Sequence, residues 1–259
     1  MQSAFKDLWL GLTRWRLWTL LAFENLKANY HRTYLGPVWV VVGFMAFVGV
    51  KLFIFSRLSP ADGNYFAAHL LLGFGIWTLI AGCISSGAAT LINAKGWIMG
   101  IKSPYSLFVL QAIFGQMLNF VILLIVIFPV AYYLRPYSVA DALWAFGGIF
   151  VNFFSLFWVM LFLAIVCVFA RDLVQVVSTI MRISFFITPI VWIPSDLGSR
   201  SFIANWVPFT HYIAIFRAPL MGERASLLNW SIVGGITLSF LILSIVAFTI
   251  FRKRIPAHL

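Results

Sequence analysis

Long runs of apolar residues alternate with short polar connections along nearly all of the chain after residue 34. A helix needs about 20 apolar residues to cross the roughly 30 Å hydrocarbon core of a bilayer. Uniformly apolar runs of this length favour helices, because strands of a membrane barrel alternate apolar and polar residues. We therefore predict an all-α membrane protein with one transmembrane domain, 35–254. Its six predicted spans are 35–56, 67–92, 106–134, 142–169, 173–193 and 230–251.

The composition agrees with this pattern. Of the 259 residues, 63% are hydrophobic and 10% are charged, and a soluble domain cannot bury that much apolar surface in one core. Cys83 and Cys167 both fall within predicted spans, where we interpret them as small packing residues rather than a disulfide or metal pair. The first 34 residues lack the pattern of a cleavable signal peptide, so we expect none.

The distribution of Lys and Arg predicts the orientation. The two termini and the second and fourth loops between the predicted spans carry eleven basic residues, namely Lys6, Arg14, Arg16, Lys27, Arg32, Lys95, Lys102, Arg171, Arg252, Lys253 and Arg254. The other connections carry five, namely Arg57, Arg135, Arg200, Arg217 and Arg224. The richer side is cytoplasmic by the positive-inside rule, which places both termini in the cytoplasm. The net charge of +11 then reflects topology and anionic lipid, and we expect no nucleic-acid partner.

Residues 1–34 are too charged to span and predict a cytoplasmic amphipathic interface helix. At 100° per residue one face is apolar and aromatic, comprising Phe5, Leu8, Trp9, Leu12, Trp15, Leu20, Phe23, Leu26 and Tyr30. Asp7, Arg14, Asn25 and Arg32 lie opposite. Such a helix lies along the membrane surface, either as an anchor alone or as a surface that also contacts a cytoplasmic partner.

Two connections have unusual compositions. The basic loop 93–104 contains glycines and Lys102, but its spacing differs from that of a phosphate-binding loop, so any ATP would be bound by another polypeptide. The loop is either a plain connector or a docking element. The segment 194–229 is apolar and is divided by Pro194, Pro208 and Pro219. It predicts short re-entrant helices, either gating the outer mouth or lying passively at the interface.

Arg182 lies about ten residues into the fifth predicted span, where an unpaired charge costs several kcal/mol. None of the seven acidic residues lies deep in a span, so we expect Arg182 to face a water-filled cavity, backbone carbonyls or an anionic ligand. Lys51, nearer the end of its span, is expected to snorkel. Aromatic residues make up 18% of the chain and suit lipid contact, packing or a path for sugars.

The sequence contains no recognised catalytic motif. Asp62, Asp141, His69 and His211 fall near the predicted outer surface and leave a polytopic enzyme as a minor alternative. We otherwise expect a chain without catalytic, cofactor or metal residues of its own.

Four stretches, in this order, resemble the membrane subunit of type-2 ATP-binding-cassette exporters, in the branch that exports polysaccharides such as O-antigen, capsule or teichoic acid. They are 21–39 with Tyr34-Leu35-Gly36-Pro37, 93–104, 170–190 with Phe185-Phe186-Ile187-Thr188-Pro189-Ile190, and Pro208 followed by Arg217. Val207 and Trp97-Ile98-Met99 depart from the usual family residues. The resemblance covers about residues 15–254.

The resemblance implies a homodimer in the bacterial inner membrane, joined to two ATPase subunits that bind ATP and Mg and exporting a lipid-linked glycan. The residues expected to dock the ATPase are Glu24, Lys27, Lys95, Trp97, Ile98, Lys102, Arg171 and Asp172. Candidate residues of the substrate path are Arg182, Trp39, Trp77, Phe185 and Trp192. Those of a periplasmic gate are Trp206, Pro208, Tyr212 and Arg217. A drug or small-lipid exporter on the same scaffold is the alternative.

Overall fold

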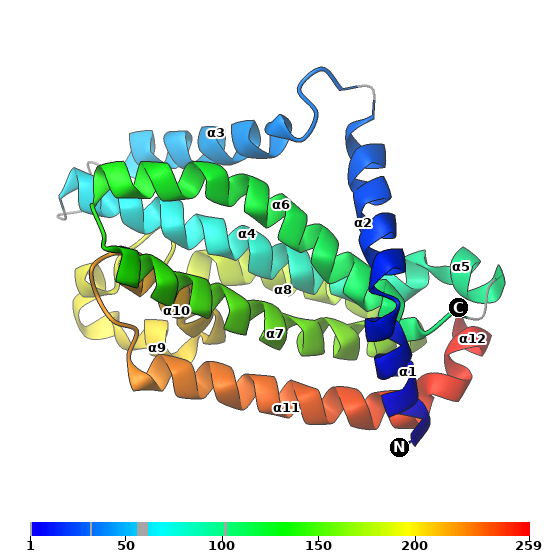
Figure 1. Cartoon of the computed structure of the whole chain (residues 1–259). Coiled ribbons are helices and arrows are strands. Elements are labelled where there is room, and N and C mark those ends of the chain that lie inside the picture. The colour runs from blue at the N-terminus through cyan, green and yellow to red at the C-terminus, as the bar shows by residue number, and fades with distance from the viewer. Residues whose placement is uncertain (1, 32, 56–61, 101–102) are drawn as a thin grey trace.

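The computed structural model describes residues 2–31, 33–55, 62–100 and 103–259, and this part of the chain folds into a helical bundle (Figure 1). Position 56 of the first predicted span and Lys102 lie outside the described residues. The long helices are α3 (Val38–Phe55), α4 (Gly63–Asn93), α6 (Tyr105–Leu134), α7 (Val139–Phe169) and α11 (Leu227–Phe251). The shorter ones are α1 (Gln2–Thr13), α2 (Trp15–Tyr30), α5 (Lys95–Gly100), α8 (Asp172–Ile187), α9 (Phe202–Trp206), α10 (Pro208–Leu220) and α12 (Ile255–His258).

Five of these helices, all described in full, are long and apolar enough to cross a bilayer, and they match five predicted spans. The remaining prediction, 173–193, corresponds to α8, which has 16 residues and is about 24 Å long. Helix α8 ends at Ile187, earlier than predicted, because Pro189 cannot donate a backbone hydrogen bond and disfavours helical geometry at Thr188. The chain then turns through residues 188–193.

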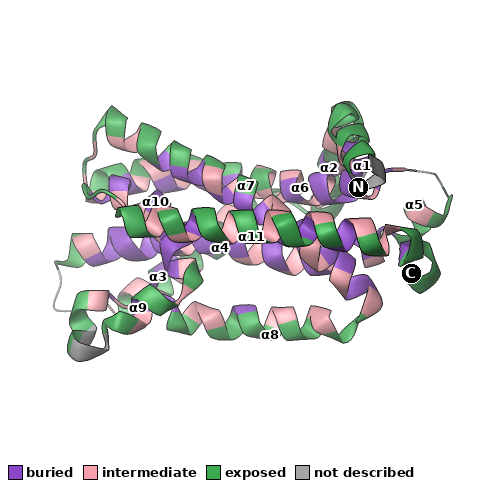
Figure 2. Ribbon diagram, turned by 90° about the horizontal axis from the view of Figure 1, so that it is seen from below, coloured by how far each residue is buried: buried purple, intermediate pink, exposed green. Residues whose placement is uncertain are grey.

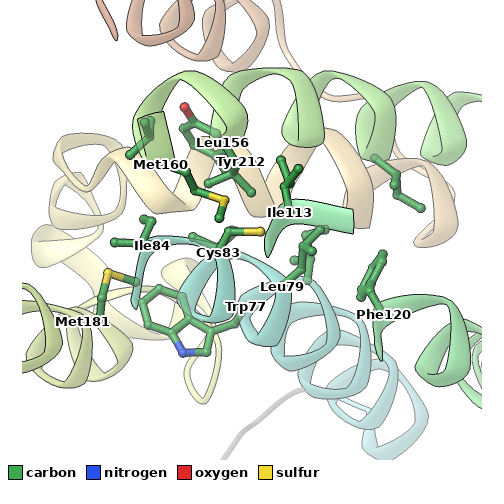
Figure 3. Close-up of a cluster of buried hydrophobic side chains, with 14 of the residues drawn as sticks. Trp77, Leu79, Cys83, Ile84, Ile113, Phe120, Leu156, Met160, Met181 and Tyr212 are labelled. Carbon is green, nitrogen blue, oxygen red and sulfur yellow. The ribbon is translucent and has the colours of Figure 1, made fainter. Parts of the chain in front are cut away.

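Helix α4 forms the centre of the bundle. Most of its residues are buried, and it packs against α3, α6, α7, α8 and α10. At Gly87 an added Cβ atom would lie 2.9 Å from the Cα atom of Met160, so only glycine allows α7 to approach this closely. Figure 3 shows Met160 directed towards Cys83 and Ile84 of α4. Close approach of this kind favours association of helices in hydrocarbon, where packing replaces the hydrophobic effect.

Helices α3 and α8 lie on one side of the bundle and bury little surface. Only Phe44 and Val48 of α3, and only Met181 of α8, are buried. Figure 2 shows α8 as mostly exposed and intermediate residues beside the buried α4. The two helices therefore present large apolar faces, which in a membrane contact lipid or another protein.

The N-terminal segment differs from the prediction of one continuous helix, because it breaks at Arg14 into α1 and α2. Both helices lie across one end of the bundle (Figure 1), and Phe5, Trp9 and Phe23 remain exposed. The placement of Asp7 on a polar outer face was wrong. Asp7 is 1% exposed, because α1 packs this side against α6 and α11.

Asp7 ties three helices together. Its carboxylate accepts hydrogen bonds from the backbone N–H groups of Tyr105 (3.3 Å) and Ser106 (3.1 Å) at the start of α6. It also accepts from the Ser106 hydroxyl and from the Arg252 guanidinium, each at 2.9 Å. Pro104 provides no side-chain cap for α6, so Asp7 supplies the cap from another helix.

We expect Asp7→Ala to destabilise the protein by about 2 kcal/mol, because it removes a helix cap and the partner of Arg252. The measurement is thermal unfolding of the detergent-solubilised chain. Glu24→Ala is the matched control, since Glu24 forms only an exposed 3.3 Å ion pair with Lys27, worth at most about 1 kcal/mol. An equal loss of stability in both variants would show that the Asp7 contacts contribute no more than the exposed Glu24–Lys27 ion pair does.

Candidate functional site

A groove of 550 Å³ runs between α3, α4 and α8 on the weakly packed side of the bundle. Its walls are largely aromatic, and it holds two cations, Lys51 from α3 and Arg182 from α8. Serine hydroxyls from α4 and α8 complete the polar lining. The other lining residues are Phe47, Phe74, Trp77, Ala81, Ser85, Ser178, Met181, Phe185 and Phe186.

The two cations have few partners within the described residues. Arg182 Nε donates to the Ser178 carbonyl, 3.3 Å away and one helical turn back, so the terminal nitrogens of the guanidinium can still donate. The Lys51 ammonium lies 5.3 Å and 5.4 Å from the ring centres of Phe47 and Phe55. These cation–π contacts hold the ammonium beside the groove without neutralising it. The contact of Arg182 with a carbonyl and a cavity agrees with the sequence-based expectation.

The aromatic walls form one connected cluster. The rings of Phe47 and Phe74 stack with centroids 4.1 Å apart. Phe185 contacts Phe47, Phe74 and Trp77 with centroid separations of 5.8–6.0 Å. Because rings of α3, α4 and α8 meet here, the groove offers flat apolar surfaces next to positive charge.

The structure brings together three of the five candidate path residues. Arg182, Trp77 and Phe185 line the groove. Trp39 lines a separate cavity on the α6 side of α3. Trp192 lies in the turn after α8, where its indole N–H donates to the Phe186 carbonyl at 3.1 Å. Phe47 and Phe74 were not predicted as lining residues, because an aromatic residue within an apolar run carries no signal of its contacts.

At the end of the bundle remote from α1, a buried network joins α4, α10 and the turn after α8. Arg217 Nη1 donates to the Pro189 carbonyl at 2.8 Å and lies 3.0 Å from His69 Nε2. Burial lowers the pKa of Arg217 to about 10, so it stays charged at neutral pH and can only donate. His69 Nε2 also lies 3.2 Å from the Trp192 carbonyl oxygen, so the tautomer of the imidazole decides which of these two contacts is a hydrogen bond. A Cβ atom at position 73 would lie 3.1 Å from Arg217 Nη1, so glycine there leaves room for the guanidinium.

This network joins in space two of the stretches that carried the family resemblance, the turn at Pro189 and the helix from Pro208 to Arg217. Arg217 thus ties α10 to α4 and to the turn after α8. Tyr212 is buried too: its carbonyl accepts from Asn152 Nδ2 at 3.1 Å, and its hydroxyl lies 2.5 Å from that of Ser155. Both contacts fasten α10 to α7.

The other two candidate gate residues lie towards α9. Trp206, the last residue of α9, is 83% exposed, and Pro208 is the first residue of α10. The structure therefore separates a buried α10 from a more exposed α9 and the short helical turn Pro194–Arg200 before it. The gating role of all four residues stays a prediction.

The candidate docking residues that the structure describes gather at the α1–α2 end of the bundle, where α5 and the start of α8 also lie (Figure 1). Glu24, Lys95, Trp97 and Asp172 are exposed, as is Lys27, and Ile98 is half-buried. Arg171 has a structural partner instead, since its Nη2 donates to the Leu259 carbonyl at 2.9 Å. Their docking role stays a prediction.

The four residues considered for an enzyme have separate structural contacts. His69 Nε2 lies 3.0 Å from Arg217 Nη1, and His211 lies 2.7 Å from Asn229 Oδ1 and 3.0 Å from the Asn205 carbonyl. Asp62 caps α4, and Asp141 forms a capping box with Ser138. No group of three His, Cys, Asp or Glu side chains suited to a metal occurs among the described residues.

The bundle and its groove define a polytopic helical membrane protein, and comparison with known proteins narrows the class. No family model matches the chain. The chain is 24% identical over 243 residues to the O-antigen export system permease protein RfbA of Klebsiella pneumoniae, covering 92% of this chain and 91% of that protein. It is 23% identical over 220 residues to the RfbA permease of Myxococcus xanthus, covering 76% and 78%. The chain is thus a distant homologue of O-antigen export permeases.

We expect Arg217→Leu to loosen the turn at 188–193, because the Pro189 carbonyl loses its donor. Backbone amides of this turn should exchange hydrogen with solvent at least about tenfold faster, as loss of a charged hydrogen bond predicts. Hydrogen-exchange mass spectrometry measures this, with Arg224→Leu as the control because Arg224 is exposed. Unchanged exchange in Arg217→Leu would show that the network does not hold the turn.

Proposed function

We propose that this chain is the transmembrane subunit of an ATP-driven exporter that moves a lipid-linked polysaccharide across the bacterial inner membrane. The observation that carries the proposal is homology to O-antigen export permeases over nine tenths of the chain, combined with five membrane-length helices. The relatives are permeases, so we assign transport rather than catalysis to the chain. ATP and Mg would be bound by a separate ATPase subunit, and nucleic acid plays no part.

In this proposal α8 is the fifth of six spans, and both termini are cytoplasmic. Helix α8 runs alongside α4 (Figure 2). The turn at 188–193 adds length to it and contacts Arg217 through the Pro189 carbonyl. The α1–α2 end carries the excess of Lys and Arg, which supports a cytoplasmic assignment for it. The segment from Pro194 to Leu220 would then lie at the periplasmic side, with α9 and the turn before it as the mobile part of a gate.

We infer a homodimer in which the exposed faces of α3 and α8 meet those of a second copy. The groove would then be enclosed by the two copies and form the translocation path. Two ATPase subunits would contact α2, α5 and the start of α8 from the cytoplasm. Exposed Trp97 and Lys95 on α5, together with Glu24 and Lys27 on α2, suit such a protein surface.

The chemistry of the groove suits a glycan carried on a lipid phosphate. Aromatic rings offer stacking surfaces to sugar C–H groups, and Lys51 and Arg182 attract the phosphate of a lipid carrier or an acidic sugar. Cations beside aromatic walls in a low-dielectric site bind anions more strongly than the same groups do in water. The alternative substrate is a drug or small lipid, carried by the same helical scaffold. Such a substrate would contact the aromatic rings but would not need both cations.

We expect Arg182→Gln to reduce glycan export on the order of tenfold while the complex still assembles, because a charged hydrogen bond to substrate is lost. Surface glycan measured on cells lacking the chromosomal copy provides the readout. Arg254→Gln is the control, since Arg254 is exposed and lies outside the groove. Full export in Arg182→Gln would remove Arg182 from the path.

We also expect the chain to copurify with an ATPase subunit and to hydrolyse ATP only in that complex. The sequence has no nucleotide-binding loop, so the purified chain alone should show no turnover above a blank preparation. A phosphate-release assay on both samples makes the comparison. Hydrolysis by the chain alone would refute the proposed division of labour.

A further inference from the structure

A second cavity of 480 Å³ lies on the other side of α3, between α3, α4 and α6. The Phe47–Phe74 stack borders both this cavity and the groove, and so separates them. Unlike the groove, the cavity has no charged lining residue. Its polar lining is Thr78 of α4 and the carboxamides Gln116 and Asn119 of α6, and Trp39 and Tyr30 stand at its α2 side.

A third cavity of 330 Å³ continues the same face towards the α2 and α5 end. It too lacks a charged lining residue, and its polar lining is Asn25, Ser86, Thr90, Asn93 and Gln111. Both cavities are bounded by α2, α4 and α6, one with α3 and the other with α5.

A row of four polar residues and one glycine on α4 connects the two cavities. Thr78, Gly82, Ser86, Thr90 and Asn93 follow one another at intervals of four, four, four and three residues, which places them in one row along the helix. The row extends about 22 Å at 1.5 Å per residue. Gln111, Gln116 and Asn119 of α6 face it from the other side. We call these eight residues the polar track.

Gln116 fills the part of the track between the two cavities. A Cβ atom added at Gly82 would collide with Gln116 Oε1, so glycine at position 82 makes room for the carboxamide. The track therefore continues past Gly82 and is not closed by an apolar side chain.

The carboxamides of the track have no hydrogen-bond partner within the described residues, and Asn119 Oδ1 is fully buried without one. An unpaired carboxamide in the hydrocarbon region is costly, and polar groups retained there generally have a function. Thr78 and Thr90 donate their hydroxyl protons to carbonyls of α4, each at 2.7 Å, which leaves their oxygens free to accept. The track thus offers both donors and acceptors and no charge.

We propose that the polar track binds the neutral, hydroxyl-rich sugar units of the exported molecule. This inference rests on the proposed function and adds a site distinct from the groove. Neutral carboxamides and hydroxyls match sugar hydroxyls, and Trp39, which is about half exposed, offers a ring for stacking. A phosphate would find no cation here, and an acyl chain would leave the carboxamides unpaired.

The test uses the full chain in lipid nanodiscs, prepared without any sugar detergent. The probe is a photoreactive alkyl maltoside, compared with an alkyl probe of equal length that lacks the sugar. Peptides modified after illumination are mapped by mass spectrometry. We expect the maltoside to label the peptides that carry Trp39 and Gln116 at least fivefold more than the sugar-free probe does.

Two independent variants test the track itself. The double variant Q116L/N119L removes the carboxamides, and Gly82→Ala displaces Gln116 while keeping them. Both should lower maltoside labelling severalfold, and Q116L/N119L should retain or raise the midpoint of thermal unfolding because it removes unpaired polar groups. Gln175→Leu, an exposed carboxamide on α8, is the matched control and should leave labelling unchanged.

Equal labelling by the two probes, or unchanged labelling in both variants, would overturn the proposal in favour of a lipid-filled cavity. A lower unfolding midpoint in Q116L/N119L would overturn it in favour of a structural role. A measurement of surface glycan on cells distinguishes failure of the polar-track proposal from failure of the proposed function. Normal export by Q116L/N119L alongside loss in Arg182→Gln would refute the track alone, whereas export that does not require the gene would refute the function.

Discussion

Hydrocarbon offers no hydrogen bonds, and this constraint accounts for most of the architecture. Peptide groups are satisfied within long helices, and many of the polar side chains inside the bundle either bind a neighbouring helix or line a cavity. Asn152, Ser155 and Ser244 are of the first kind, since Asn152 and Ser155 contact Tyr212 and the Ser244 hydroxyl donates to the Trp158 carbonyl at 2.7 Å. Arg182 and Gln116 are of the second kind.

The polar ties concentrate at the two ends of the bundle. At one end Asp7 joins α1 to α6 and α11, and at the other Arg217 joins α10 to α4 and to the turn at Pro189. Together with the contacts of Asn152 and Ser155 with Tyr212, they hold α4, α6, α7, α10 and α11 as a packed unit. Helices α3 and α8 contact that unit mainly through one face each. In the proposed exporter they are therefore the helices most able to shift when an ATPase presses on α2 and α5.

The cavities on the two sides of α3 divide the chemistry that a lipid-linked glycan requires. The groove towards α8 combines Lys51 and Arg182 with aromatic walls, whereas the track towards α6 contains only neutral donors and acceptors. The Phe47–Phe74 stack stands between them. A substrate with both a phosphate and neutral sugars has a complementary surface in each.

Hydropathy located the five long membrane helices well, because an apolar run of about 20 residues is satisfied by few structures other than a membrane-spanning helix. Proline chemistry explains why α8 ends at Ile187, although the apolar run continues beyond it. Contacts between distant residues could not be predicted: Arg217 and His69 are 148 positions apart, and nothing local marks either as a partner. Asp7 was misplaced for the same reason. Helical periodicity assigns a charged residue to the solvent-facing side of its helix, and it contains no information on a carboxylate that caps another helix.

Of the five candidate path residues, the structure brings Arg182, Trp77 and Phe185 together in one groove, and their role in a substrate path stays a prediction. Trp39 lines the cavity on the other side of α3, and its role stays a prediction as well, because the sequence does not show towards which neighbour a ring on α3 turns. Lys51 was interpreted only as a snorkelling residue, since its approach to Arg182 depends on how α3 packs against α8.

The orientation of the bundle in the bilayer is the central claim, and cysteine accessibility tests it most directly. With Cys83 and Cys167 replaced by alanine, single cysteines at positions 98 and 253 and at positions 206 and 224 are treated with a membrane-impermeant maleimide on intact spheroplasts. We predict labelling at 206 and 224, and labelling at 98 and 253 only after the membrane is permeabilised. The reverse pattern would contradict the account.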